Sequence, residues 1–213
     1  MYKSLEKGRS MIEMLGVLAI IGVLSVVGIA WYSKAMEIYK SNLQRNTLAE
    51  LLHNMIKIKD QFNKNMESRD IADILYAMGE TPKSLHYKQS ANGFIDIDNN
   101  VIDPQYGFSN AHGKLRYTIY IFLYQNSKNL TITARNYCYN LALAAQTIAD
   151  DVIQIYVYYG SSNPNKPNGE SKTIFNSKNL KNPSIAQIHQ ICDNSLPDDA
   201  TRISHFTISL NPN

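Results

Sequence analysis

An uncharged apolar run near the N-terminus constrains this chain more than any other feature of its sequence. The run extends from Met14 to Tyr32 without a charged residue, and Glu13 stands directly before it. Its length is close to the ~20 residues that an α-helix needs to cross the apolar core of a bilayer. A carboxylate at the centre of such a span costs ~2.5 kcal/mol or more. Because simple anchoring needs no carboxylate, Glu13 is a candidate functional residue.

Helical periodicity continues beyond the apolar run. From Met36 to Met66, large apolar residues recur at steps of mostly three and four positions, with charged and amide side chains between them. No proline or glycine interrupts residues 29–66. The pattern predicts one helix from about Met11 to about Met66, roughly 80 Å long. Its first half is apolar on every side, whereas its second half has one apolar stripe that suits packing on a globular head.

The segment before this helix, residues 1–8, is short and mildly basic, as on the cytoplasmic side of a membrane helix. A secretory signal peptide is the alternative interpretation, and residues 28–30 (Gly-Ile-Ala) would supply its cleavage site. The apolar run is longer than the usual core of a signal peptide, and the helical pattern continues far past residue 30. These two features favour a retained helix.

Composition argues against several functional classes. The net charge is +3 over 213 residues, and no cluster of Lys and Arg of the kind that binds nucleic acid is present. The five histidines are scattered without the spacing of metal ligands. No nucleophile with a base and no phosphate loop stands out, so we expect no enzyme, cofactor or small-molecule substrate. A tyrosine-rich stretch containing Tyr117, Tyr120 and Tyr124 is interpreted as sheet packing or a subunit interface rather than a ligand site.

Two small groups of residues leave alternatives open. Cys138 and Cys192 are the only cysteines, and an even, minimal count on the exported side of a membrane favours one disulfide over two buried thiols. Asp96, Asp98 and Asp103 invite a calcium site, but the glycine and closing glutamate of an EF-hand are missing. Solvated acids on a strand or loop are therefore the preferred interpretation, and no metal site is assigned.

The remainder of the chain predicts an α+β head. A short helix is expected over residues 71–78, ended by Gly79, and a loop over residues 81–92. Strands are expected at 94–98, 115–123, 130–134, 152–159 and 203–210, helices at 136–150 and from Pro183 to Cys192, and loops at 125–129 and 161–172. Helix and strand signals thus alternate through the C-terminal half.

The N-terminal motif resembles the processing motif of type IV pilins. It reads Gly8-Arg9-Ser10-Met11-Ile12-Glu13 and is followed by the apolar run. In that family a prepilin peptidase cuts after the glycine, the new N-terminal amine is methylated, and a glutamate lies five residues into the mature chain. The resemblance implies cleavage between Gly8 and Arg9, N-methylation of Arg9 and an assembly role for Glu13. Most pilins begin the mature chain with Phe or Met, whereas this one would begin with Arg9.

In the family, the glutamate pairs with the cationic N-terminal amine of a neighbouring subunit. Pairing lowers the cost of burying either charge. The alternative partner of Glu13 is Arg9 of the same helix, four positions away, a contact worth a few tenths of a kcal/mol. Many pilins carry a proline in the apolar helix, where this chain has Gly16, Gly22 and Gly28. These glycines are interpreted as allowing close helix approach rather than softening the helix.

The C-terminal half looks like that of the larger, type IVb-like pilins, including those of conjugative pili. In these proteins the two cysteines are joined, which implies a Cys138–Cys192 disulfide that closes a loop of about 55 residues and stabilises by roughly 4 kcal/mol. The implied fold is α+β: a long N-terminal helix, with its apolar half protruding, packed on an antiparallel sheet with a disulfide-stapled C-terminal region. The implied segments are a cleaved leader (1–8), a hydrophobic half-helix (9–32), an amphipathic half-helix (33–66) and a globular head (67–213).

The resemblance implies a structural subunit of a type IV pilus or related filament. Its expected partners are further copies of itself in a helical filament, the prepilin peptidase and an assembly platform in the bacterial inner membrane. Before assembly we expect a single-pass inner-membrane protein, and afterwards a cell-surface or periplasmic pilus. The polar loop at 161–172 is expected on the outer face of the filament. The alternatives are a pseudopilin or minor pilin of a secretion or DNA-transfer system, and a singly anchored adhesin.

Overall fold

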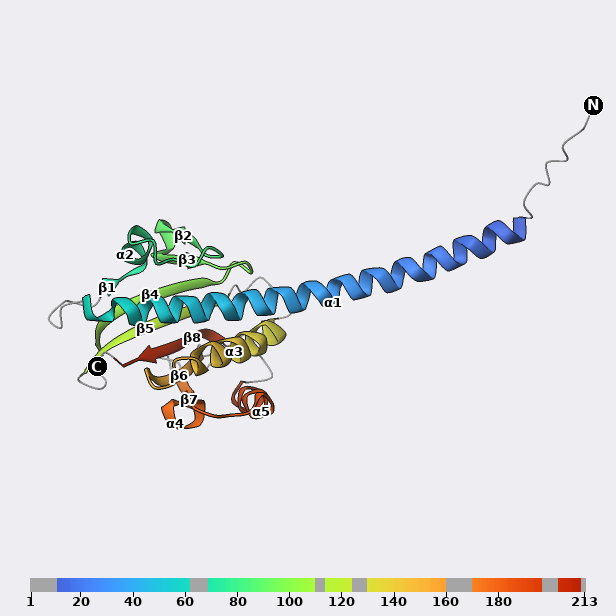
Figure 1. The fold of residues 1–213 in the computed structure, drawn as a ribbon. Helices are drawn as coiled ribbons and strands as arrows, with labels where there is room; N and C mark the ends of the chain where they lie inside the picture. The colour runs from blue at the N-terminus through green and yellow to red at the C-terminus, as the bar shows by residue number, and fades with distance from the viewer. Residues whose placement is uncertain are drawn as a thin grey trace, which may run out of the picture. The chain divides into compact units, whose positions relative to one another are not determined.

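The computed structural model describes residues 11–61, 69–109, 114–123, 130–159, 170–196 and 203–211. These residues form an α+β fold in which helices accompany one antiparallel sheet of eight strands (Figure 1). The predicted fold class is confirmed. By its internal contacts the chain divides into two compact units, Met1–Lys40 and Ser41–Asn213.

The first helix, α1 (Met11–Ile58), is continuous across both units. Its residues up to Lys40 are mostly exposed, whereas Leu51 and Met55 in its later part are completely buried. This change follows the predicted change from an all-round apolar helix to one with a single apolar stripe. The helix was expected to reach about Met66, but α-helical geometry ends at Ile58 and a 3₁₀ turn, η1 (Lys59–Gln61), follows. Residues 62–68 lie outside the described part of the chain.

Every strand pairing among the described residues is antiparallel. Its strands are β1 (Arg69–Asp70), β2 (His86–Lys88), β3 (Gly93–Ile95), β4 (Val101–Ser109), β5 (Lys114–Phe122), β6 (Val152–Tyr159), β7 (Glu170–Asn176) and β8 (Ile203–Leu210). Their order is β2-β3-β4-β5-β8-β6-β7, and β1 pairs with β4 beside β3. The last strand of the chain, β8, therefore lies in the middle of the sheet, between β5 and β6.

Four further α-helices complete the second unit. They are α2 (Ala72–Ala77), α3 (Leu130–Gln146), α4 (Ser177–Leu180) and α5 (Ile185–Ser195), with a 3₁₀ turn η2 (Gln89–Ala91) before β3. The part of α1 after Lys40 and α3 lie side by side, because Asn140 of α3 accepts a hydrogen bond from Ser41 (3.1 Å) and donates one to Gln44 (2.7 Å). Both helices cover the sheet face that carries Ile119 and Phe206, and the buried residues form one core there.

The prediction of a strand at 130–134 is wrong, since these residues form the first turns of α3. The β-branched residues Thr131, Ile132 and Thr133 favour a strand locally. The buried positions 134, 137, 138, 141, 142 and 145 instead repeat at three- and four-residue intervals, the period of a helix. Packing of this stripe on the core overrides the local preference. The predicted hairpin loop at 125–129 lies outside the described residues.

Four strands were not predicted: the short strands β1 and β2 and the longer strands β4 and β7. The loop expected at 81–92 is wrong at His86–Lys88, which form β2. In β4, Pro104 is a residue that normally argues against an inner strand. Its carbonyl accepts a hydrogen bond from the Ile71 N–H (2.9 Å), on the side of β1 rather than β5. Because the N–H and C=O of one strand residue point to the same side, the missing proline N–H removes no hydrogen bond to β5. Ser171 and Lys172, near the start of β7, are exposed and polar, so their sequence was read as the end of the loop expected at 161–172.

Several other boundaries agree with the sequence. The strands at 152–159 and 203–210 are confirmed as β6 and β8. The short helix after residue 70 is confirmed as α2 and ends as expected at Gly79, whose φ is +72°. The N–H of Glu80 bonds to the carbonyl of Leu75 (2.9 Å) and that of Gly79 to Tyr76 (3.1 Å), a pairing that requires a left-handed residue at Gly79.

Candidate assembly surface

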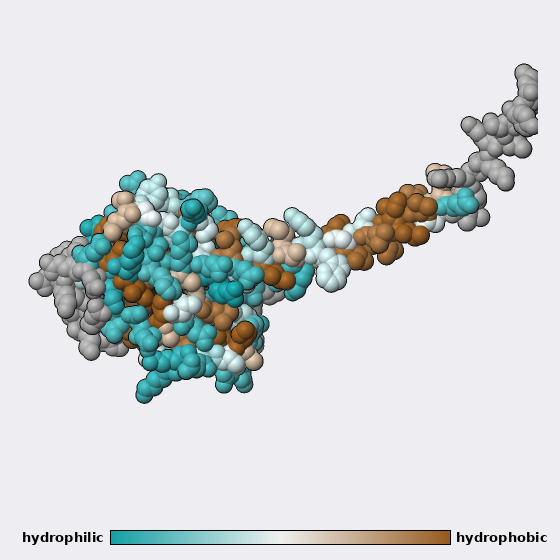
Figure 2. Space-filling view, in the orientation of Figure 1, coloured by the Kyte–Doolittle hydropathy of each residue, from teal (hydrophilic) through white to brown (hydrophobic). Residues whose placement is uncertain are grey.

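The apolar part of α1 presents large side chains to its surroundings on every side. From Met14 to Tyr32 their exposed fractions range from 47% at Val27 to 73% at Trp31. Figure 2 shows hydrophobic residues along this helix, interrupted by paler residues of intermediate hydropathy. Burying one such side chain is worth about 1.5–3 kcal/mol, so water is a poor solvent for the whole segment. The helix is long and apolar enough to cross a membrane, and a signal sequence meets the same criteria.

Glu13 lies in the first turn of α1 and is exposed. A carboxylate at this position is favoured by the positive end of the helix dipole. Gly8 and Arg9, the residues of the expected cleavage and methylation site, lie outside the described part of the chain. The alternative contact between Arg9 and Glu13 lies outside it too. The structure therefore places the Glu13 carboxylate directly before the apolar surface of α1.

Polar groups within the apolar part of α1 bond to the helix itself. The hydroxyl of Ser25 donates to the carbonyl of Ile21 (2.8 Å), and that of Ser33 to Ile29 (3.0 Å). Such bonds satisfy a hydroxyl that has no water in lipid or in a filament core. An ion pair between Lys34 and Glu37 (3.6 Å) follows the apolar run. The surface thus changes from apolar to charged within a short distance along the helix.

The three glycines of this segment have no packing reason within the chain. A Cβ atom added at Gly16, Gly22 or Gly28 would meet no neighbouring atom within 4 Å. Glycine weakens a helix interior by about 1 kcal/mol relative to alanine. Successive glycines six positions apart are rotated by about 240° at 3.6 residues per turn, so the three point in different directions. This distribution suits a helix that is approached by neighbours from several sides.

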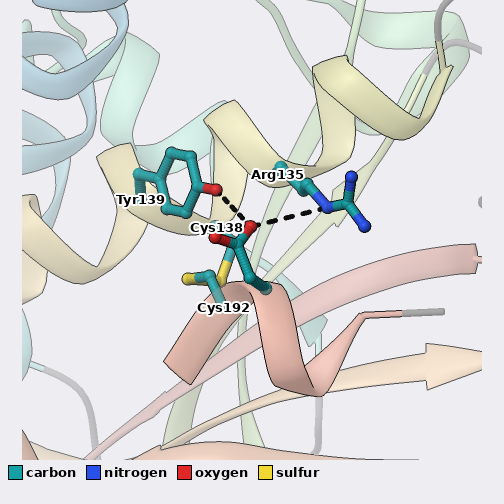
Figure 3. Close-up of a disulfide and its surroundings, with 5 residues drawn as sticks. Arg135, Cys138, Tyr139 and Cys192 are labelled. Atoms are coloured by element: carbon teal, nitrogen blue, oxygen red, sulfur yellow. Dashed lines mark hydrogen bonds and ion pairs between the residues drawn. A yellow bond between two sulfur atoms is a disulfide. The ribbon is translucent and has the colours of Figure 1, made fainter. Parts of the chain in front are cut away.

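A disulfide joins the helices α3 and α5. Cys138 of α3 and Cys192 of α5 are bonded, with 6.0 Å between their Cα atoms, and both are buried. The next residue on each helix forms a second link across the same interface, because the Tyr139 hydroxyl donates to Asp193 (Figure 3). Arg135 also approaches Asp193, at 3.5 Å. Burial and the bond to Asp193 raise the pKa of Tyr139 to about 12, so this hydroxyl remains a donor at neutral pH.

The interpretation of the aspartates as solvated acids is wrong for two of the three. Asp96 is only 6% exposed, and its carboxylate accepts hydrogen bonds from the backbone of Asp98 (2.9 Å) and Asn100 (2.8 Å). It also accepts from the Asn100 amide (2.8 Å) and the Tyr137 hydroxyl (3.1 Å). Burial raises the pKa of Asp96, and these bonds lower it in part. Asp96 therefore organises the β3–β4 turn against α3.

Asp103 is the second buried aspartate, and it lies on the face of the sheet opposite α1 and α3. One of its oxygens accepts a hydrogen bond from Gln105 (2.7 Å), and the other has no hydrogen-bond partner among the described residues. Burial raises the pKa of Asp103 to about 6, with a smaller contribution from the nearby charge of Asp70. Within the described residues no group of three or more His, Cys, Asp or Glu is placed to hold a metal ion.

The tyrosine-rich stretch has two faces. Tyr117 is buried in the core and donates to the Lys59 carbonyl, whereas Tyr120 is half-buried on the opposite face; Tyr124 is not described. His205, a residue that the sequence did not single out, lies at the centre of an aromatic cluster on that opposite face, 5.5 Å from Tyr120 and 5.1 Å from Tyr158 between ring centroids. Burial lowers the pKa of His205, which favours its neutral form.

The residues of the polar loop before Glu170 also lie outside the described ranges.

Comparison of the chain with protein-family models, with curated proteins and with solved structures finds no match. The architecture itself is pilin-like. It combines a long N-terminal helix with an exposed apolar surface, an antiparallel sheet packed against the later part of that helix, and a C-terminal disulfide. The fold thus agrees with the resemblance that the N-terminal motif carries.

Proposed function

We propose that this chain is a structural subunit of a type IV pilus or a related filament, exported as a prepilin and cut after Gly8. The observation that carries the proposal is the exposed, charge-free surface of α1 from Met14 to Tyr32, with Glu13 directly before it. Lipid covers this surface in the inner membrane before assembly. Other copies of the same helix cover it in the filament. The proposal needs no catalytic activity, metal or cofactor of the chain itself.

The pairing of Glu13 with the methylated amine of Arg9 on a neighbouring subunit gives assembly its register. Each charge is expensive when buried alone among apolar side chains, while a close pair is much less so. An incoming subunit one position out of register would leave both charges unpaired. The apolar contacts of the helix are not directional, so this charge pair selects one arrangement among many similar ones.

The substitution Glu13→Ala tests this role. We expect the variant to be inserted, processed and folded like the wild type, while the yield of sheared surface filaments falls at least tenfold. The tenfold loss corresponds to about 1.4 kcal/mol, well below the cost of one uncompensated buried charge. Glu37→Ala is the matched control, because Glu37 is an exposed carboxylate of the same helix outside the apolar run. Normal filament yield from Glu13→Ala would remove the assembly role proposed here.

Processing is tested separately by Gly8→Asp. The peptidase of the family cuts after glycine, so we expect this variant to keep its leader and remain in the inner membrane. Mass spectrometry of the wild type should show a chain that begins with N-methylated Arg9, and that of the variant should show residues 1–8 still attached. A mature chain beginning at Arg9 in the variant would contradict cleavage by this route. Filament microscopy on both strains separates a pilus subunit from a singly anchored surface domain.

A further inference from the structure

A cleft lies between α4 and α5. Its volume is about 470 Å³, and its mostly exposed lining leaves it wide open to solvent. Its lining includes Lys178, Lys181, Asn182, Pro183 and Gln190. No sequence motif marks this region, which consists of two short helices and the turn between them.

Both walls of the cleft are held rigidly. The Asn176 side chain accepts from the backbone of Asn179 (3.1 Å) and the Asn179 side chain accepts from Asn176 N (2.7 Å), a reciprocal cap at the start of α4. Ser184 and Gln187 form the same arrangement at the start of α5, with bonds of 3.2 and 2.8 Å. Leu180 anchors α4 in the core. A cleft fixed in this way loses little conformational entropy when a ligand binds.

The turn and the second helix have further anchors. Ile188 is fully buried, and Cys192, one turn later, is held by the disulfide to α3. The carbonyl of Pro183, in the turn, accepts a hydrogen bond from the Gln146 amide of α3 (3.3 Å). The backbone that carries the cleft is therefore tied to α3 at two places.

The cleft presents cations and amides. Among the described residues that line it, none is acidic, and the two lysines provide ammonium groups. Lys181 also pairs with Asp150, outside the lining, so Lys178 carries the stronger positive field. The amides of Asn182 and Gln190 each offer a donor and an acceptor, the pattern that sugar hydroxyls need. Pro183 and Ile191 are half-buried and add an apolar surface that suits the C–H face of a sugar ring.

We propose that this cleft binds an anionic saccharide, with a sugar carboxylate at Lys178 and hydroxyls at the neighbouring amides. Duplex DNA fits less well, because its binding requires many cations that follow the phosphate backbone. A neutral sugar would leave the ammonium of Lys178 without a counter-charge. The site is independent of filament assembly, since it uses none of the residues of the apolar helix.

The test is calorimetric titration of the full chain in a non-ionic detergent. Two carboxylated probes represent the two sources of such sugars: trigalacturonate for acidic polysaccharides and sialyllactose for sialylated glycans. We expect at least one to bind, and the double variant Lys178→Gln/Gln190→Ala to weaken that binding at least tenfold. Lys83→Gln is the matched control, because Lys83 is an exposed lysine outside the cleft, and it should leave the affinity unchanged.

Neutral maltotriose and a short DNA duplex complete the design. Neither is expected to compete with the bound carboxylated probe. Failure of both carboxylated probes to bind at millimolar concentration would overturn the proposal. Equal binding of maltotriose, tighter binding of the duplex, or unchanged affinity in the double variant would also overturn it. The two substituted side chains are exposed, so a matching thermal unfolding curve will confirm that a loss of binding is not a loss of folding.

Discussion

Asp96 and Asp103 show how two buried carboxylates of one head differ in the quality of their surroundings. Asp96 receives four hydrogen bonds from a turn and from Tyr137, so its charge is well solvated by the protein. Asp103 receives one from Gln105, and within the part of the chain that the structure describes its second oxygen accepts none. An unpartnered buried acceptor costs about 1–3 kcal/mol. Replacing the Asp103 carboxylate should therefore increase the free energy of unfolding of the head.

The substitution Asp103→Asn should make the head more stable at neutral pH. The pKa of Asp103 is about 6 in the folded chain, above its ordinary value of 3.8. The folded state thus holds this proton more tightly, and the associated stability is complete below about pH 4 and lost as the pH rises through 6. One pKa unit is worth about 1.4 kcal/mol, so after solvent screening we expect a gain of about 1–2 kcal/mol at pH 7.

The measurement is chemical denaturation of both proteins at pH 4 and pH 7. The variant should have a higher free energy of unfolding than the wild type at pH 7. This difference should be much smaller at pH 4, where Asp103 is protonated. Glu37→Gln, which changes an exposed carboxylate of α1, should leave the pH dependence as it is in the wild type. A variant that is less stable at pH 7 would show that the carboxylate of Asp103 has a stabilising partner.

At the scale of elements, the sequence predicted those whose pattern agrees with their position in the fold. The strands β6 and β8 are rich in β-branched and aromatic residues, and both were predicted with the observed boundaries. The first turns of α3 were mistaken for a strand because local preference and tertiary packing disagree there. Glycine at position 93 is explained only by a contact distant in sequence, since a Cβ there would lie 2.6 Å from the Ile102 carbonyl. Such contacts follow from the pairing of strands and cannot be read from neighbouring residues.

Removal of the disulfide should weaken the attachment of α5 to α3. The bonded cysteines are 54 positions apart, and a loop of this size is worth about 4 kcal/mol of stability on the chain-entropy model. We expect Cys138→Ala/Cys192→Ala to lose about that much free energy of unfolding in urea. Reduction of the wild type with a membrane-permeant phosphine should produce a similar loss.

A control substitution at Tyr139 distinguishes loss of the disulfide from loss of a neighbouring contact between α3 and α5. Tyr139→Phe removes the neighbouring hydrogen bond to Asp193 and keeps the disulfide, so it should cost only about 1 kcal/mol. A double cysteine variant whose midpoint in urea equals that of the wild type would contradict the stapling role. So would free thiols at both cysteines in protein purified from the cell surface.

At the scale of the whole molecule, the two candidate sites differ in how visible they are in the sequence. The apolar surface of α1 and Glu13 are contiguous, so a simple count of charges finds them. The cleft at Lys178 and Gln190 is formed by two short consecutive helices and the turn between them, and no sequence motif marks it. The architecture was accessible because a helix with an apolar half and a striped half admits few arrangements. The details that decide binding were not accessible.

Deletion of residues 1–32 should leave a folded and soluble head. The buried apolar core of the described residues begins at Leu48, so a chain that starts at Ser33 keeps it complete. The deletion removes the exposed apolar surface and retains the charged residues Lys34 and Glu37. We expect a monomer in analytical ultracentrifugation without detergent, with an unfolding midpoint within a few degrees of that of the full chain.

A control chain that starts at Leu52 loses Leu48 and Leu51 from the core and should not fold. Aggregation of the chain that starts at Ser33 would show that the apolar half of α1 also stabilises the head, in which case assembly and folding could not be separated by a cut at this position.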